Sequence, residues 1–217
     1  MIKKIRRFFE LVQKRQLWSL LYMRICLYKL REIRGHFSLL FHKLLYHNFS
    51  VGKNVRCWGK IIVGMSEDSF ITLGNNIRMA SDNKRSGIAL FSHCKFRTFA
   101  NGKIVIGNNA ELSGVSITSR KKIVIGDGAM LGPNTIIVDS DFHKFWPPEE
   151  RALGAGFEED REVIIGKQVY VGMNSIILKG VNIGNHSIVA AGSVVSGVFP
   201  ADVVIAGNPA RVVGKRP

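Results

Sequence analysis

Cysteine and proline are scarce in this sequence, with three and six copies among 217 residues. Cys26, Cys57 and Cys94 are odd in number and form no CxxC pair, so they match neither a disulfide framework nor a zinc site. A reducing compartment is the simplest expectation, and we therefore predict a cytoplasmic protein.

Long uncharged runs are also missing from the start of the chain. The longest one in the first 48 residues, Gln16 to Met23, is too short to span a bilayer as a helix. The charged beginning has no uninterrupted apolar core behind it, so a secretory signal is not expected.

Acidic residues are scarce in the same segment. Residues 1–48 hold eleven Lys and Arg against Glu10 and Glu32, a net charge of +9 out of +15 for the whole chain. This asymmetry predicts a basic segment, residues 1–48, attached to a more ordinary domain, residues 49–217.

Apolar residues recur at helical spacing in residues 1–47, which predicts one or two amphipathic helices with Gly35 as a plausible break. Two interpretations stay open. The apolar face packs on the main domain or a partner subunit, or it lies on the inner face of the cytoplasmic membrane with Trp18 at the boundary. Nucleic acid is a poorer partner, because no reading motif accompanies the charge.

Glycine is abundant, and from Val51 onward a six-residue beat of aliphatic residues replaces the helical spacing. The unbroken run consists of Ile165, Val171, Ile177, Ile183, Val189 and Val195; shorter runs are Ile125, Leu131 and Ile137, and Ile106 and Leu112. Such hexads predict a mainly β, three-sided prism of short parallel strands, in which each aliphatic residue points inward and stacks on the next coil.

Two breaks in the beat locate irregularities. Ile106 and Ile125 are nineteen residues apart, one more than three hexads, which predicts a one-residue bulge within residues 119–122. Ile137 and Ile165 are twenty-eight apart, so a loop over residues 141–162, which contains two adjacent prolines, must leave the prism. Long loops that interrupt a regular scaffold are often functional.

His143 stands where this loop begins, six residues after Ile137. A histidine beside a carboxylate can take a proton from a hydroxyl group, and Asp139 and Asp141 are both near in sequence. The spacing leaves open whether Asp139, Asp141 or a backbone carbonyl orients the imidazole. The alternative is a surface histidine in a polar loop.

Four segments in order resemble one family: residues 138–143 (ValAspSerAspPheHis), 164–175, 183–195, and 206–213 (AlaGlyAsnProAlaArgValVal). Together they resemble the hexapeptide-repeat O-acetyltransferases, relatives of galactoside, maltose and serine acetyltransferases, and especially the members from bacterial surface-polysaccharide gene clusters. The resemblance covers roughly residues 50–215. It implies a left-handed β-helix, acetyl-CoA as co-substrate, no required metal, and a homotrimer with active sites between subunits. It also implies a saccharide or glycolipid acceptor and His143 as general base.

The resemblance assigns further residues to the site. Coenzyme-binding positions are Tyr170, Gly172, Lys179, Ala190, Ala191, Gly192, Ser196, Arg211 and Lys215. Small residues admit a thin pantetheine arm and basic groups attract phosphates. On the acceptor side, Ser113 stands where relatives often have asparagine, and Trp146 lies in the loop. Tyr170 stands where tryptophan is usual.

Competing functions remain. An N-acyltransferase acting on an amino sugar nucleotide uses the same scaffold and is the main alternative. A metal-dependent hydratase on the same prism needs three converging histidines, and His93, His143 and His186 lack the paired spacing. A scaffold without activity leaves the loop histidine unexplained.

Overall fold

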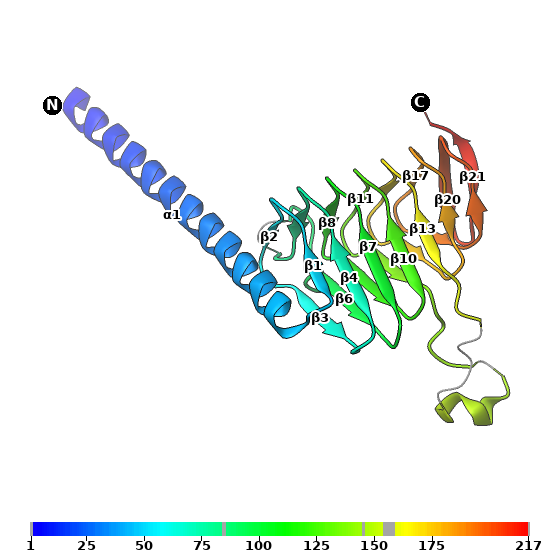
Figure 1. Ribbon diagram of the computed structural model, residues 1–217. Helices are drawn as coiled ribbons and strands as arrows, with labels where there is room; N and C mark the ends of the chain where they lie inside the picture. The colour runs from blue at the N-terminus through cyan, green and yellow to red at the C-terminus, as the bar shows by residue number, and fades with distance from the viewer. Residues whose placement is uncertain (1, 84–85, 145, 154–158, 217) are drawn as a thin grey trace.

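The computed structural model consists of one long helix followed by a three-sided parallel β-helix (Figure 1). It describes residues 2–83, 86–144, 146–153 and 159–216, and it describes side chains for all of these except 2–9, 11–12, 16–17 and 151–153. Helix α1 runs from Ile2 to Leu45 and projects away from the first coil of the prism (Figure 1).

Three sheets, named A, B and C here, form the sides of the prism. Sheet A contains β1 (Phe49–Val51), β4 (Phe70–Leu73), β7 (Lys103–Ile106), β10 (Lys122–Ile125), β13 (Val163–Ile165), β16 (Asn182–Ile183) and β19 (Val198–Phe199). Sheet B contains β2 (Arg56–Trp58), β5 (Arg78–Ala80), β8 (Glu111–Ser113), β11 (Met130–Leu131), β14 (Tyr170–Val171), β17 (Ile188–Val189), β20 (Val203–Gly207) and β21 (Ala210–Lys215). Sheet C contains β3 (Ile62–Met65), β6 (Lys95–Thr98), β9 (Ser116–Ser119), β12 (Ile136–Val138), β15 (Ile176–Ile177) and β18 (Val194–Val195).

The chain visits the sheets in the order A, B, C, and we name the turns between them the AB, BC and CA corners. The paired strands are parallel, except that β21 folds back antiparallel on β20. This pattern confirms the predicted prism.

The predicted aliphatic beat forms the core. Residues eighteen apart pair in register on neighbouring coils, as in Ile165 with Ile183 and Val171 with Val189. All six residues of the unbroken run are at most 1% exposed. Each strand therefore buries one aliphatic side chain in the prism, and the stacked ladders hold the coils together by apolar burial.

Polar residues shape the AB corners. Asn54, Asn76 and Asn109 follow one another up this edge with φ near +57°, a conformation that asparagine tolerates better than most residues. Their amides form a ladder, in which Asn54 Nδ2 donates to Asn76 Oδ1 (3.2 Å) and Asn76 Nδ2 to Asn109 Oδ1 (3.1 Å). His186 occupies a corresponding corner position with φ +60°.

The predicted bulge lies in the correct corner but is not a single inserted residue. The core residues Leu112 and Ile117 are only five apart, and Ile117 and Ile125 are eight apart. The BC corner is one residue short and accommodates this with Gly114 at φ +52°, whereas the CA corner has two extra residues. The sequence spacing reports only the net difference of one.

The prediction of a helix break at Gly35 is wrong, because α1 continues through it. Gly35 lies against strand β2, where a Cβ atom would stand 1.9 Å from the carbonyl oxygen of Cys57. The glycine therefore permits close packing of the helix on the first coil, a role that sequence spacing does not distinguish from a break.

A second excursion from the prism was not predicted. Between β5 and β6 the chain leaves the BC corner, and the described part of this excursion is residues 81–83 and 86–94. Asn134, two coils further on, holds it in place: its Oδ1 accepts from the Phe91 amide (2.8 Å) and its Nδ2 donates to the Ala89 carbonyl (3.0 Å).

Candidate active site

His143 lies in the loop that leaves the CA corner between β12 and β13, and its side chain is exposed. The loop carries a short 3₁₀ helix, η1 (Pro148–Leu153), and extends beyond the prism (Figure 1). Residues 145 and 154–158 of the predicted loop lie outside the described residues. Trp146, the predicted acceptor contact, is 74% exposed.

The residue before His143 ties the start of the loop to the prism. The Phe142 ring lies 5.8 Å from the ring of Phe99, which stands on the CA corner two coils earlier. Its amide donates to Ser140 Oγ (2.9 Å), and its φ of +63° turns the chain sharply. His143 therefore follows an anchored residue, although its own side chain is accessible.

Asp139 is fully buried at the base of the loop, and its carboxylate caps the coil before it. It accepts hydrogen bonds from Ser119 Oγ (2.6 Å), Arg120 N (2.8 Å) and Lys121 N (2.9 Å). Burial raises the pKa of Asp139, and the hydrogen bonds from Ser119 and the backbone oppose this shift. Asp139 thus stabilises the corner that contains the two extra residues.

Asp141 pairs with Lys179, which lies on a CA corner one coil further on. Lys179 Nζ also contacts Glu159 Oε2 (3.3 Å), on the returning arm of the loop. These contacts raise the pKa of Lys179, the hydrogen bond to Asp141 contributing most. The ammonium group, predicted as a coenzyme contact, is engaged here in joining both arms of the loop to the prism.

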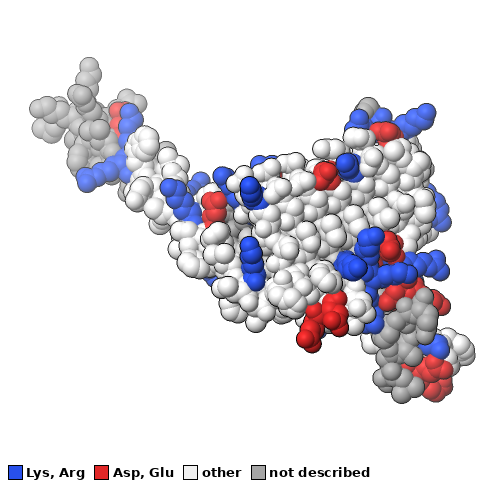
Figure 2. Space-filling model, in the orientation of Figure 1, with Lys and Arg blue, Asp and Glu red and all other residues white. Residues whose placement is uncertain are grey.

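The returning arm has a second anchor. Arg120 Nε lies 3.2 Å from Asp160 Oδ2, and Lys121 Nζ donates to the Asp160 carbonyl (3.2 Å). Figure 2 shows the resulting mixture of acidic and basic side chains where the loop meets the prism. The base of the loop is thus fixed on both sides by charged contacts.

The predicted coenzyme residues lie mostly along sheet B and its BC corners. Tyr170 points outward from β14 and is 45% exposed. Gly172 allows the coils to approach closely, since a Cβ there would stand 2.4 Å from Ala191 N. Gly192 has φ +72° and open space beside it, and Ala191 is exposed. This corner, which also contains Ala190, offers a smooth backbone surface to a narrow ligand.

The basic candidates of the tail lie on β21, which covers the last coil. Arg211 and Lys215 are both exposed, and Arg211 Nη1 donates to the carbonyl of Ala210 (2.8 Å). Ser196, by contrast, is exposed at a CA corner. The tail therefore adds positive charge to the end of sheet B.

Ser113 ends β8 at a BC corner and lines a hollow of about 410 Å³. Arg78 and Glu111, which form an ion pair, also line this hollow, together with residues 86–88 of the second excursion. Sequence reasoning missed this pair, because the two residues are thirty-three apart and belong to no motif. Only the register of β5 on β8 brings them side by side.

The predicted site residues therefore form two groups within one chain. His143, Asp139, Asp141, Lys179 and Ser196 lie at CA corners, where strands of sheet C end. Ser113, Gly172 and the 190–192 turn lie at BC corners, where those strands begin. A strand of sheet C separates the two groups, and such a strand rises about 3.3 Å per residue.

Comparison with known proteins now identifies the family. A model described as bacterial transferase hexapeptide (six repeats) matches residues 162–197. WbbJ of Escherichia coli (strain K12), described as a putative lipopolysaccharide biosynthesis O-acetyl transferase, is 32% identical over 145 residues, which are 62% of this chain and 69% of WbbJ. The chain belongs to the hexapeptide-repeat acetyltransferases.

Another relative also has an acetyltransferase name. The galactoside O-acetyltransferase of Lactococcus lactis is 37% identical over 93 residues, 43% of each chain. The fold is the predicted left-handed β-helix. It is shared by AntD, an N-acyltransferase from Bacillus cereus solved in complex with dTDP and 3-hydroxybutyryl-CoA (TM-score 0.59, 23% identity, 81% of this chain and 88% of AntD).

This acetyltransferase does not present its buried thiols as nucleophiles. Cys57 and Cys94 are at most 1% exposed, and burial raises the pKa of both. A thiol that resists ionisation is a poor acyl acceptor, because the thiolate is the reactive form. Neither buried thiol is therefore suited to form an acyl-cysteine intermediate.

Proposed function

We propose that this chain transfers an acetyl group from acetyl-CoA to a hydroxyl group of a saccharide acceptor used for a bacterial surface polysaccharide. The observation that carries the proposal is His143, an accessible histidine on a loop whose base is fixed by charged contacts and by the packing of Phe142. The names of WbbJ and of the galactoside enzyme support an oxygen acceptor and a glycan product.

In the proposed reaction His143 acts as general base. Its neutral imidazole takes the proton of the acceptor hydroxyl while the oxygen attacks the thioester carbonyl. A backbone N–H at a coil edge stabilises the oxyanion of the tetrahedral intermediate. The intermediate then expels the coenzyme thiolate, which receives the proton from the imidazolium.

Asp139 and Asp141 each bind other groups in the chain. Through these contacts both carboxylates fix the point at which the loop that carries His143 leaves the prism. We assign them positioning roles, through the corner cap and through Lys179 respectively.

We further propose a homotrimer in which each active site is shared. Within one chain, sheet C separates His143 from the BC corners that carry Ser113, Gly172 and the 190–192 turn. A CA corner that meets the BC corner of a neighbouring copy reunites them, and cyclic symmetry repeats this contact in all three clefts. The free thiols fit a reducing compartment, so we place the reaction in the cytoplasm.

Subunit mixing tests the shared site. His143→Ala and Gly192→Trp should each be inactive as homotrimers, the first lacking the base and the second obstructing the coenzyme path. Trimers refolded from a mixture should regain part of the wild-type turnover, because some clefts contain neither defect. Absence of any recovery, in mixtures shown by mass spectrometry to contain both chains, would contradict the shared site.

Analysis of the product tests whether the acceptor atom is oxygen or nitrogen. Incubation with acetyl-CoA and a panel of saccharides, followed by mass spectrometry, should show an added acetyl group that mild base removes, because esters hydrolyse under conditions that amides survive. A base-resistant product formed on amino sugars would instead establish the N-acyltransferase alternative.

A further inference from the structure

Helix α1 contacts the prism along one side of its C-terminal half only. The Tyr28 ring lies 5.6 Å from Trp58, Arg31 Nε lies 3.8 Å from Asp82 Oδ1, and Gly35 packs on β2. Further along the helix, Ser38 Oγ accepts from the Ile61 amide (3.1 Å), and Leu39 is buried in the core. The rest of the helix surface faces away from the prism (Figure 1).

A continuous apolar band runs along the side of α1 opposite this contact. We call it the outer stripe: Tyr22, Met23, Cys26, Leu30, Ile33, Phe37, Leu40, Phe41 and Leu44. At 3.6 residues per turn these positions fall within an arc of roughly 100°, which contains no charged residue from position 22 to position 44. Every side chain of the stripe is exposed, and Tyr22, Phe37 and Leu44 are 71%, 67% and 87% exposed.

Basic residues flank the stripe on both sides. Lys29 and Lys43 lie along one edge and Arg34 along the other. Figure 2 shows basic side chains distributed along the helix. Of the two acidic residues in the first 48, Glu32 lies 3.7 Å from Arg56 of the prism, so it is turned toward the protein.

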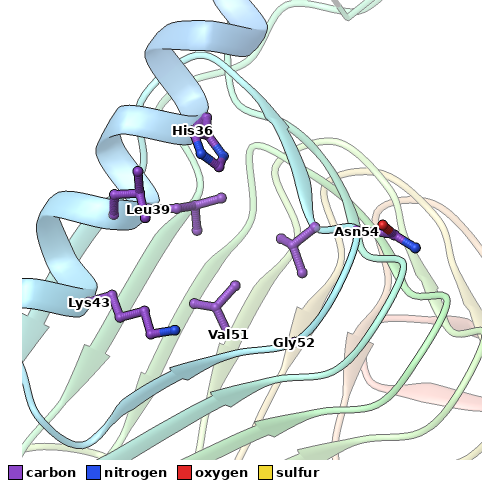
Figure 3. Close-up of a pocket in the computed structure, with 8 residues that line it drawn as sticks. His36, Leu39, Lys43, Val51, Gly52 and Asn54 are labelled. Atoms are coloured by element: carbon purple, nitrogen blue, oxygen red, sulfur yellow. The ribbon is translucent and has the colours of Figure 1, made fainter.

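The Lys43 edge also borders a groove. A cavity of about 360 Å³ lies between α1 and the first coil, lined by His36, Leu39 and Lys43 of the helix and by Val51 and Val55 of the coil (Figure 3). The His36 and Lys43 side chains extend from the helix toward this space (Figure 3). Apolar walls with a cation at the rim match an acyl chain below an anionic headgroup.

We propose that α1 is a membrane-docking helix, which lies in the surface of an anionic lipid bilayer with the outer stripe among the acyl chains and the flanking cations at the phosphates. No helix among the described residues is long and apolar enough to cross a bilayer. Docking in the plane of the surface is therefore the mode that the stripe supports. The proposal is independent of the acetyltransferase reaction and is tested without it.

Charge decides between a bilayer and a second copy of the helix. The three- and four-residue spacing of the stripe also fits a coiled coil. In a parallel coiled coil, however, Lys29 of one copy would oppose Arg34 of the next, and no acidic residue flanks the stripe to compensate. Anionic lipid neutralises these cations instead of adding like charges.

Flotation of the intact protein with vesicles tests the proposal. The protein should float with phosphatidylcholine vesicles that contain phosphatidylglycerol and remain at the bottom with phosphatidylcholine alone. High salt should weaken the binding, since the cations contribute through Coulomb attraction. Flotation with neither vesicle, or equal flotation with both, would overturn the proposal.

Cys26 gives a second readout, because it is exposed in the stripe whereas Cys57 and Cys94 are buried. A polarity-sensitive fluorophore on Cys26 should shift to the blue on addition of the anionic vesicles. A fluorophore that does not shift, combined with rapid oxidative cross-linking of Cys26 between copies, would assign the stripe to a second copy instead.

Matched variants test whether membrane binding depends on the outer stripe or on exposed apolar residues in general. Phe37→Glu with Leu44→Glu should lower the partition coefficient by roughly a hundredfold or more, since two large apolar side chains no longer enter the bilayer. Phe70→Glu with Val198→Glu replaces two exposed apolar residues of sheet A and should leave binding unchanged. Equal losses in both double variants, with both folded by circular dichroism, would contradict the proposal.

Discussion

The hydrogen bonds that Asp139 accepts at its corner allow a quantitative prediction about the base of the loop that carries His143. Asp139→Ala removes a fully buried acceptor from two backbone amides and one hydroxyl. A buried donor left without a partner costs about 1–3 kcal/mol, and removal of the buried charge offsets part of that sum. We expect a net loss of about 3 kcal/mol in the free energy of unfolding. For a chain of this size that corresponds to a fall in Tm of roughly 6–12 °C.

Asp127 supplies the matched control. Its Oδ1 accepts hydrogen bonds from Asn108 N (2.8 Å) and Asn108 Nδ2 (3.2 Å), but its side chain is 41% exposed, so water can replace it. Asp127→Ala should therefore cost at most about 1 kcal/mol. Thermal unfolding followed by circular dichroism compares the two. Equal melting temperatures for both variants would refute the cap. An Asp139→Ala enzyme with wild-type stability and no turnover would support Asp139 as the direct partner of His143.

Two further substitutions test other contacts. Gly35→Ala should destabilise the protein by about 2–4 kcal/mol, because its Cβ would meet the Cys57 carbonyl. In an exposed helix the same change would instead stabilise the protein by about 1 kcal/mol. A stabilised variant in urea unfolding would therefore show that α1 does not dock as described. Lys179→Met should lower kcat several-fold while Asp141 and Glu159 lose their common partner, and wild-type kcat in that variant would exclude the anchoring role. Because the pKa of Lys179 is raised in the folded state, its stabilisation is complete below the ordinary value of 10.5 and is lost as pH rises through the folded value. On the alkaline side, the difference in Tm between wild type and Lys179→Met should therefore shrink only above about pH 10.5, and a difference that shrinks already between neutral pH and about pH 9 would contradict the assigned cause.

The regular part of the fold could be predicted from the sequence because each short strand buries one residue type at a fixed interval. The beat from Ile165 to Val195 determines the register, and the break after Ile137 locates the loop. The N-terminal coils were less predictable. Their core positions include Cys57, Met79 and Phe96, which carry no aliphatic beat, and the excursion over residues 81–94 interrupts the spacing there.

The candidate site was predictable only in part, because sequence spacing does not show which corner a residue occupies. Ser113 and His143 lie at opposite edges of sheet C, a separation that depends on the register of whole coils. The partners of Asp139 and Lys179 likewise lie on neighbouring coils, eighteen or more residues away. Sequence proximity left open which group orients His143, and it did not predict the partners that each carboxylate binds on the stacked coils.

The role of His143 is tested most directly by kinetics together with binding on the His143→Ala protein. Acetyl-CoA affinity should be unchanged in calorimetry, because most coenzyme candidates lie along sheet B and its BC corners, and turnover with a saccharide acceptor should fall by about 10²–10⁴-fold, the usual contribution of a general base. Turnover close to that of wild type, with the same acetyl-CoA affinity, would contradict the assignment of His143 as the general base.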